Sequence, residues 1–206
     1  MSTMLSHSKK FIFIHNYKVA GSSISAVLAQ YQPNYWTRTI LRKTGVTKYF
    51  PALANFDQHA SASEVRKLVP EEIFDGYYKF SFVRNPWDWQ VSLFSYMCQF
   101  RAHFQHDLVK NFTFDEYIDW RIHCDLVLQS KRIADEQGNI LMDFVGRFEN
   151  LEADFSEICE KLGIEMRLPH KNRSKHSSYQ KYYTDKSYRL VKEAFEEDIA
   201  LFNYEF

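Results

Sequence analysis

Two short apolar runs, each followed at once by a polar turn and the start of a helix, constrain the fold most strongly. Residues 11–15 and 77–83 are almost continuously apolar, which is typical of strands buried on both faces of a sheet. Helical spacing of apolar residues begins near Ser22 after the first run. After the second run, Asn85 and Pro86 open a helix, because asparagine caps helices well and proline suits the first helical position. This alternation predicts an α/β fold with a central, mostly parallel sheet flanked by helices.

Capping patterns and breaks in periodicity locate most of the remaining elements. Four helix starts are indicated, by Ser61 with Glu64, Thr113 with Glu116, Asn150, and Thr184. Gly163 is expected to end the helix that Asn150 begins, since glycine readily adopts the left-handed conformation found at helix ends. A third strand is expected within residues 139–148, and residues 32–57 are expected to form mostly loop.

Length, charge and cysteine content limit the class of protein. The 206 residues suit one domain over residues 1–206 with a sizeable core. Lysine plus arginine and aspartate plus glutamate both number 26, so no global charge favours a nucleic-acid partner. We expect no signal sequence and no transmembrane segment, because no apolar run is long enough. Three widely spaced cysteines favour buried thiols in a reducing compartment over disulfides: Cys98, Cys124 and Cys159.

The turn after the first apolar run, HNYKVAGSS, combines features that suit an anion. A helix N-terminus presents N–H groups and the positive end of the helix dipole. Gly21 allows a close approach of backbone to phosphate, and Ser22 and Ser23 add hydroxyl donors. Lys18 adds a full charge but precedes the glycine, so the order is not that of a Walker A loop, which disfavours magnesium-dependent nucleotide hydrolysis. The simpler alternative is an ordinary helix start preceded by a surface lysine.

The second apolar run leads into another polar turn. Arg84 follows the end of that run, where a guanidinium can hold a phosphate through two hydrogen bonds. Ser92 lies two turns into the next helix and reaches the same ligand if that helix passes alongside it. Alternatively, Arg84 pairs with a carboxylate such as Asp88 and Ser92 is a small packing residue. The residues alone leave both interpretations open.

Together the two turns resemble the phosphate-binding motifs of sulfotransferases that use 3′-phosphoadenosine 5′-phosphosulfate (PAPS). Family forms are close to PKTAGTS and VRNPxxRxxSxY. Here Asn16 and Tyr17 precede the lysine, and Trp89 occupies the position of the second arginine. The resemblance to the carbohydrate-type branch covers nearly the whole chain, through HASASEVRKLVPEEIFDGYYKFSFVRNPWD, DFVGRFENLEADFSEICEKLGI, LPHKNRS and YYTDKSYRLVKEAFEEDIALFNYEF.

This resemblance implies a sulfotransferase fold similar to that of the P-loop nucleoside triphosphate hydrolases, and a donor with two phosphate sites. It implies that Arg84 and Ser92 hold the 3′-phosphate. The implied contacts of the 5′-phosphosulfate are Lys18, Ala20, Gly21, Ser22 and Ser23. A lysine and helix N–H groups at this place would stabilise the charge that develops on the leaving phosphate, as in phosphoryl transfer but with no metal. The product is adenosine 3′,5′-bisphosphate.

An acceptor hydroxyl also needs a base, and His59 matches the histidine that precedes the arginine-proline motif in this branch. Neutral imidazole suits proton transfer near neutral pH. Asp57 is the alternative base, and a histidine that only hydrogen-bonds at a helix start is the alternative role. Arg173 and Ser174 match family residues near the donor and are expected to close over the nucleotide, although a solvated basic surface would also explain the charges around them.

The acceptor is expected to be a carbohydrate or another hydroxyl-bearing molecule. The branch includes Golgi enzymes and soluble bacterial members, and this short chain resembles the latter, which implies a cytoplasmic location; a trimmed luminal domain of a Golgi enzyme is the alternative. Competing functions are a nucleotide-dependent kinase on a P-loop fold and a non-catalytic nucleotide- or glycan-binding module. No metal is expected: His103 and His106 could share a helix face but lack a third ligand at useful spacing.

Overall fold

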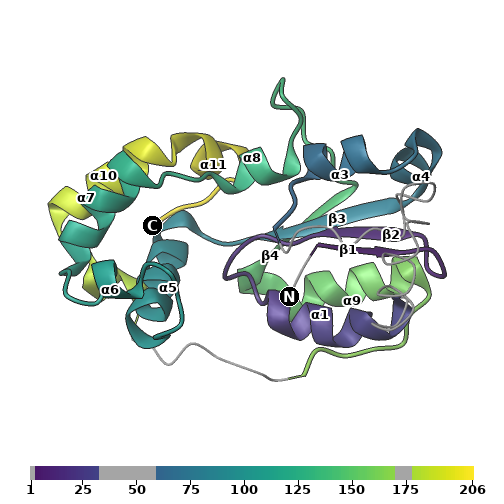
Figure 1. Ribbon diagram of the computed structural model, residues 1–206, viewed down its shortest axis with the longest axis horizontal. Helices are drawn as coiled ribbons and strands as arrows, with labels where there is room; N and C mark the ends of the chain where they lie inside the picture. The colour runs from purple at the N-terminus through teal and green to yellow at the C-terminus, as the bar shows by residue number, and fades with distance from the viewer. Residues whose placement is uncertain (1–2, 33–58, 170–177) are drawn as a thin grey trace. The chain divides into compact units, whose positions relative to one another are not determined.

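The computed structural model describes residues 3–32, 59–169 and 178–206 (Figure 1). Its chain divides into two compact units. The sheet unit consists of Met1–Val83 and Lys131–Lys171. The helical unit consists of Arg84–Ser130 and Asn172–Phe206.

Four strands of the sheet unit form one sheet in the order β1-β2-β3-β4. β1 runs antiparallel to β2, whereas the β2–β3 and β3–β4 pairs are parallel, which confirms the predicted mostly parallel sheet. Register places Phe13 opposite Phe80, and Phe80 opposite Phe144. The strands are β1 (Met4–Ser6), β2 (Phe11–Ile14), β3 (Tyr78–Val83) and β4 (Phe144–Arg147).

Helices cover both faces of this sheet. Figure 1 shows α1 and α9 on one face and α3 and α4 on the other. Every residue of β2 is buried, which explains why its sequence is continuously apolar rather than alternating. The helical elements of this unit are α1 (Gly21–Leu28), η1 (Ala29–Tyr31), α3 (Ala62–Leu68), α4 (Glu71–Gly76), η4 (Phe148–Asn150) and α9 (Leu151–Leu162).

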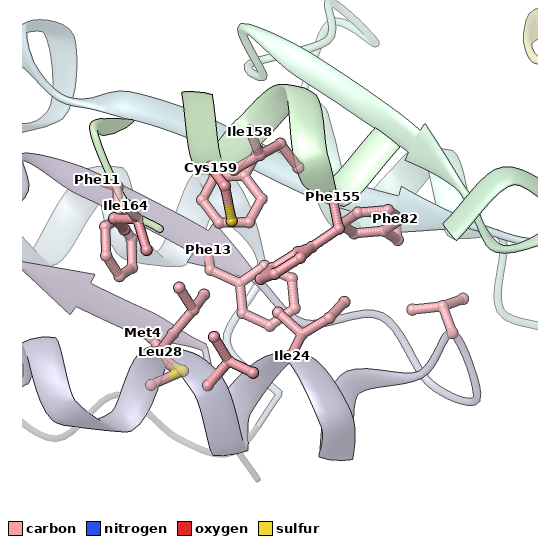
Figure 2. Close-up of a cluster of buried hydrophobic side chains, with 13 residues drawn as sticks. Met4, Phe11, Phe13, Ile24, Leu28, Phe82, Phe155, Ile158, Cys159 and Ile164 are labelled. Atoms are coloured by element: carbon pink, nitrogen blue, oxygen red, sulfur yellow. The ribbon is translucent and has the colours of Figure 1, made fainter. Parts of the chain in front are cut away.

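The main hydrophobic core lies between the sheet and the pair α1 and α9. In Figure 2, Phe13 of β2 is surrounded by side chains from both helices, including Ile24 and Phe155. Phe13 also stacks on Phe80 of β3, with ring centroids 5.2 Å apart. These contacts fix the orientation of α1, and therefore the position of the turn that precedes it.

Local capping signals are confirmed at most helix starts. Capping boxes form at Ser61, Thr113 and Thr184, and Gly163 ends α9 in the left-handed conformation. Asn150 is the N-cap of α9, as predicted, but its side chain makes no capping hydrogen bond, because the 3-10 turn η4 leads directly into α9. The last helix is also two segments rather than one.

The helical unit is built around buried aromatic rings. Trp89, Tyr117 and Phe195 are fully buried, and Trp87 is 2% exposed. Cys124 is exposed, contrary to the expectation of three buried thiols. The helices are α5 (Pro86–Gln99), α6 (His106–Val109), α7 (Phe114–Cys124), η5 (Tyr179–Tyr182), α10 (Asp185–Ala194) and α11 (Glu196–Leu201).

Helix α8 (Gln129–Ile133) starts in the helical unit and ends in the sheet unit. Among the helices that the structure describes, none has the length and apolar character needed to span a bilayer.

Candidate active site

The turn between β2 and α1 has an unusual backbone. Lys18 and Ala20 have φ angles of 56° and 60°, in the left-handed region that non-glycine residues rarely occupy. Such conformations cost on the order of 1–3 kcal/mol each and cluster at binding sites. Left-handed residues in a turn can point successive N–H groups into one concavity, where an anion binds. Ala20 is also the N-cap of α1 and has no polar side chain to cap it. This turn, with the Lys18 charge, therefore has the chemistry of an anion site.

Gly21, the first residue of α1, lies against the imidazole of His15. A Cβ atom added at Gly21 would lie 1.8 Å from His15 Nε2, so any side chain there would have to displace the ring. Among the described residues, the contact that requires glycine is thus a histidine ring, and the close approach of a phosphate suggested by the sequence stays a prediction. His15 itself is only 5% exposed. The sequence analysis missed this residue, because nothing in the pattern indicates that its ring folds over the start of α1.

The structure brings His59 to the same turn. Its ring lies 5.4 Å from the His15 ring and 4.2 Å from the Tyr17 ring, measured between centroids. The neighbouring Ala60 is tied to this place by Thr3, whose hydroxyl donates to the Ala60 carbonyl at 2.9 Å. The same hydroxyl accepts from the backbone N–H of His15 at 3.3 Å. The alternative base, Asp57, lies outside the described residues.

Arg132, which the sequence did not indicate, completes this cluster. Its guanidinium lies over the Tyr17 ring, 4.9 Å from the centroid, and its Nη2 donates to the His59 carbonyl. Burial lowers the pKa of Arg132, while Tyr17 and Glu64 raise it. Among the described residues, Arg132 Nε is buried without a hydrogen-bond partner. Arg132 therefore contacts both the backbone and the aromatic neighbour of His59.

The second predicted phosphate residue, Arg84, is the first residue of the helical unit and is 2% exposed. Its Nε donates to Asp88 Oδ2 at 2.7 Å, so the pairing left open in the sequence analysis is present. Arginine has five N–H donors, and this ion pair occupies one of them. Ser92 is 5% exposed on α5, and no described contact decides between its two predicted roles.

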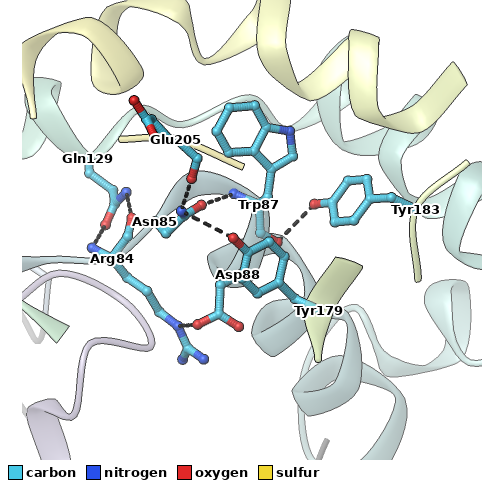
Figure 3. A network of polar contacts seen from close by, with 8 residues as sticks. All are labelled: Arg84, Asn85, Trp87, Asp88, Gln129, Tyr179, Tyr183 and Glu205. Atoms are coloured by element: carbon cyan, nitrogen blue, oxygen red, sulfur yellow. Dashed lines mark hydrogen bonds and ion pairs between the residues drawn. The ribbon is translucent and has the colours of Figure 1, made fainter. Parts of the chain in front are cut away.

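The start of α5 is held by a network of polar contacts (Figure 3). Asn85 caps the helix by accepting from the Trp87 N–H at 3.1 Å, as predicted, and its Nδ2 donates to the Glu205 carbonyl at 2.6 Å. The hydroxyl of Tyr183 donates to the Trp87 carbonyl at 2.8 Å. Burial raises the pKa of Tyr183 well above 10.0, so it stays a neutral donor. The backbone next to Arg84 is therefore rigidly defined within this unit.

The two histidines weighed as metal ligands lie at the start of α6 in the helical unit. His103 precedes α6 and His106 begins it, so the two do not share a helix face. His106 Nδ1 lies 2.8 Å from the Met97 carbonyl. Arg173 and Ser174 lie outside the described residues.

Comparison with known proteins identifies the family. A model described as the sulfotransferase family matches residues 1–205. The chain belongs to the sulfotransferase family. The match covers both units of this sulfotransferase and is consistent with a PAPS-dependent enzyme. The enzyme is also similar to a protein of Archaeoglobus fulgidus described only as uncharacterized, which is 33% identical over 102 residues. That alignment covers 48% of the sulfotransferase chain and 79% of the relative.

Family membership implies a P-loop-like fold, in agreement with the parallel sheet of this sulfotransferase. In such folds, ligands bind outside the carboxyl ends of the strands. The β2–α1 turn and Arg84 both follow the carboxyl end of a strand, β2 and β3 respectively. The resemblance stated from the sequence is thereby confirmed at the level of the family.

Proposed function

We propose that residues 1–206 act as one sulfotransferase domain, which moves the sulfuryl group of PAPS to an acceptor hydroxyl, most simply that of a carbohydrate. The observation that carries this proposal is the β2–α1 turn. It combines left-handed residues, a lysine and an uncapped helix start in a chain of the sulfotransferase family. An acceptor of the carbohydrate class follows from the resemblance to that branch.

The proposed donor contacts divide between the two turns. The 5′-phosphosulfate binds Lys18 together with Ala20, Gly21, Ser22 and Ser23. The 3′-phosphate binds the guanidinium of Arg84, whose Nε also pairs with Asp88. Ser92 assists at this phosphate, and Arg173 and Ser174 close over the nucleotide.

The proposed reaction is a single displacement at sulfur. An acceptor oxygen attacks the sulfuryl sulfur, the bond from sulfur to the bridging phosphate oxygen breaks, and adenosine 3′,5′-bisphosphate leaves. Negative charge grows on that phosphate in the transition state. A fixed lysine and backbone N–H groups there stabilise the transition state more than the ground state. No metal ion is required to balance this step.

The proton of the acceptor hydroxyl goes to His59, the proposed base. Three observations support this assignment: the ring lies beside the β2–α1 turn, Tyr17 packs against it, and Arg132 holds its carbonyl. Asp57 remains the alternative base.

Calorimetric binding without magnesium tests the donor site. We expect adenosine 3′,5′-bisphosphate to bind much more tightly than 5′-AMP or ATP. Replacing Arg84 by Ala should remove most of that preference, because a charge-assisted hydrogen bond contributes about 1.5–3 kcal/mol. The matched control is Arg121→Ala, since Arg121 is also a nearly buried arginine paired with an aspartate four residues later in the helical unit.

Two outcomes would contradict the proposal. If wild-type protein binds 5′-AMP and the bisphosphate equally, or binds neither, the non-catalytic binding module becomes the better explanation. If binding requires magnesium and favours ATP, the kinase alternative leads. Loss of preference in both arginine variants would mean that general loosening of the helical unit, not a lost phosphate contact, explains the result.

A further inference from the structure

A buried glutamine, Gln129, pairs with the backbone of Arg84. Gln129 Oε1 accepts from the Arg84 N–H at 2.9 Å, and Gln129 Nε2 donates to the Arg84 carbonyl at 2.8 Å. Figure 3 shows the amide facing this peptide edge, as a neighbouring strand would. Arg84 lies just beyond the end of β3, so its backbone groups are not paired by the sheet there. Gln129 is completely buried, and both groups of its amide are used.

Gln129 is in turn held by a buried carboxylate. Asp198 of α11 accepts from the backbone N–H of Gln129 at 2.7 Å and from that of Ser130 at 2.9 Å. Asp198 is fully buried, and burial raises its pKa although these hydrogen bonds lower it. The hydroxyl of Ser130 also donates to Glu197 Oε1 at 3.1 Å. This buried carboxyl group, which accepts two backbone hydrogen bonds, fixes the residue that holds Arg84.

The arginine is therefore constrained at both ends. Gln129 holds its backbone, and Asp88 holds its Nε, with the two charged side chains 3% and 13% exposed. A guanidinium recognises phosphate through a planar, directional set of donors, so its usefulness depends on where its stem begins. All these contacts lie within the helical unit.

We propose that Gln129, held by Asp198, is a positioning residue that sets the orientation of Arg84 for recognition of the nucleotide's 3′-phosphate. This inference rests on the proposed function and deepens it. Gln129 touches no ligand in this scheme. It acts only by fixing the backbone from which the Arg84 side chain extends.

The test compares Gln129→Met with Gln90→Met. Methionine keeps the approximate volume of glutamine and removes the amide. Gln90 is the matched control because it is also fully buried in the helical unit and uses its amide, which accepts from the Tyr117 hydroxyl at 2.9 Å rather than pairing with the Arg84 backbone as Gln129 does. Two readouts are taken for each protein: the ratio of the dissociation constants of 5′-AMP and adenosine 3′,5′-bisphosphate, and the NMR signal of the Arg84 Nε–H group. Thermal unfolding accompanies both readouts.

We expect Gln129→Met to reduce the 3′-phosphate preference by about tenfold or more, because misdirected guanidinium donors lose charge-assisted hydrogen bonds to the phosphate. The Arg84 Nε–H signal should move at the same time. Gln90→Met should lower the unfolding temperature while leaving the preference and the signal unchanged. If Gln129→Met does not fold, Asp198→Asn is measured instead. This change weakens the hydrogen bonds that Asp198 accepts from the Gln129 and Ser130 backbone but keeps the side-chain amide of Gln129.

The inference is overturned if Gln129→Met, or its substitute, keeps the full preference and an unmoved Arg84 signal. If Gln129 had only a structural role, the variant would lose thermal stability but keep the 3′-phosphate preference and the Arg84 signal. The proposed function fails separately if wild-type protein shows no 3′-phosphate preference. The inference would then fail as a statement about nucleotide recognition, even if the Arg84 signal moves.

Discussion

The His15 imidazole occupies the space that a side chain on Gly21 would need: an added Cβ would lie 1.8 Å from its Nε2. This contact joins the end of β2 to the first residue of α1. On this side, the proposed phosphosulfate turn packs against a buried ring and not against solvent. Glycine is therefore needed here for packing before any ligand is considered.

The first prediction concerns this contact. Gly21→Ala should destabilise the protein by about 1–3 kcal/mol, because a side chain forced into a packed site displaces its neighbour. Urea unfolding measures the change. Gly76→Ala is the control, since a Cβ at Gly76 meets nothing within 4 Å. Combining Gly21→Ala with His15→Ala should cost less than the sum of the two single changes. Equal effects at Gly21 and Gly76 would show that the ring is not the obstacle.

The second prediction concerns His59. His59→Ala should lower turnover by about 10²–10⁴-fold, the usual contribution of a positioned base, and leave bisphosphate affinity unchanged. Added imidazole should restore part of the rate. His123→Ala, at an exposed position of α7, is the control. Unchanged turnover in the His59 variant, together with loss in Asp57→Asn, would move the base to Asp57.

The third prediction concerns Arg132. Arg132→Lys keeps the charge but loses the planar group that lies over Tyr17 and donates to the His59 carbonyl. We expect turnover to fall about tenfold, with nucleotide affinity unchanged, because the proposed base is displaced. Arg66→Lys is the matched control: Arg66 also lies over a ring in the sheet unit, but that ring belongs to Phe74, which is not a proposed site residue. Equal losses in both variants would argue against a role in positioning.

The fourth prediction concerns acid stability. Hydrogen bonds from the backbone N–H and hydroxyl of Thr113 hold the pKa of Glu116 below its usual 4.5. A carboxylate whose pKa is lowered by folding stabilises the protein above about pH 4.5 and loses that contribution as the pH falls through its folded value. Glu116→Gln should therefore be less stable than wild type near neutral pH, with the difference shrinking in acid.

Unfolding by urea at several pH values measures this difference. The control is Glu160→Gln, an exposed position on α9 outside any capping box. The same pH dependence at both positions would show that general surface charge, rather than the capping box, is responsible. Glu64 has the same arrangement with Ser61, and its pKa is lowered for the same reason.

Features encoded by neighbouring residues were predictable. The parallel strands follow from continuous apolar runs, and two capping boxes follow from a hydroxyl residue three positions before a glutamate. Strand β1 could not be predicted, because three residues are too few to show a hydrophobic periodicity. Its pairing with β2 also depends on a turn in which Lys10 has a φ of 49°. Helix α9 begins after Asn150 as expected, but the Asn150 side chain makes no capping hydrogen bond, because a preceding 3-10 turn changes the geometry of the helix start.

In the candidate site, too, the residues close together in the sequence were predictable and those joined by long-range contacts were not. The β2–α1 turn was recognised because lysine, glycine and serines lie within six positions. Arg132 was missed because it contacts the residue 73 positions earlier, His59, and its short helix has no special pattern. Gln129 was missed for a similar reason, since its side-chain amide pairs with the backbone of Arg84, which is 45 positions earlier. Such long-range contacts leave no periodic trace in the sequence.

The left-handed conformations of Lys18 and Ala20 set a limit on how this enzyme could be made more heat-resistant. Glycine adopts that conformation without steric cost, so selection for thermostability alone would favour replacing either residue with it. Glycine would also let the turn sample other shapes before the donor arrives, and part of the binding energy would then be spent on restoring order. Variants that survive heating best at these two positions should therefore be among the slower catalysts.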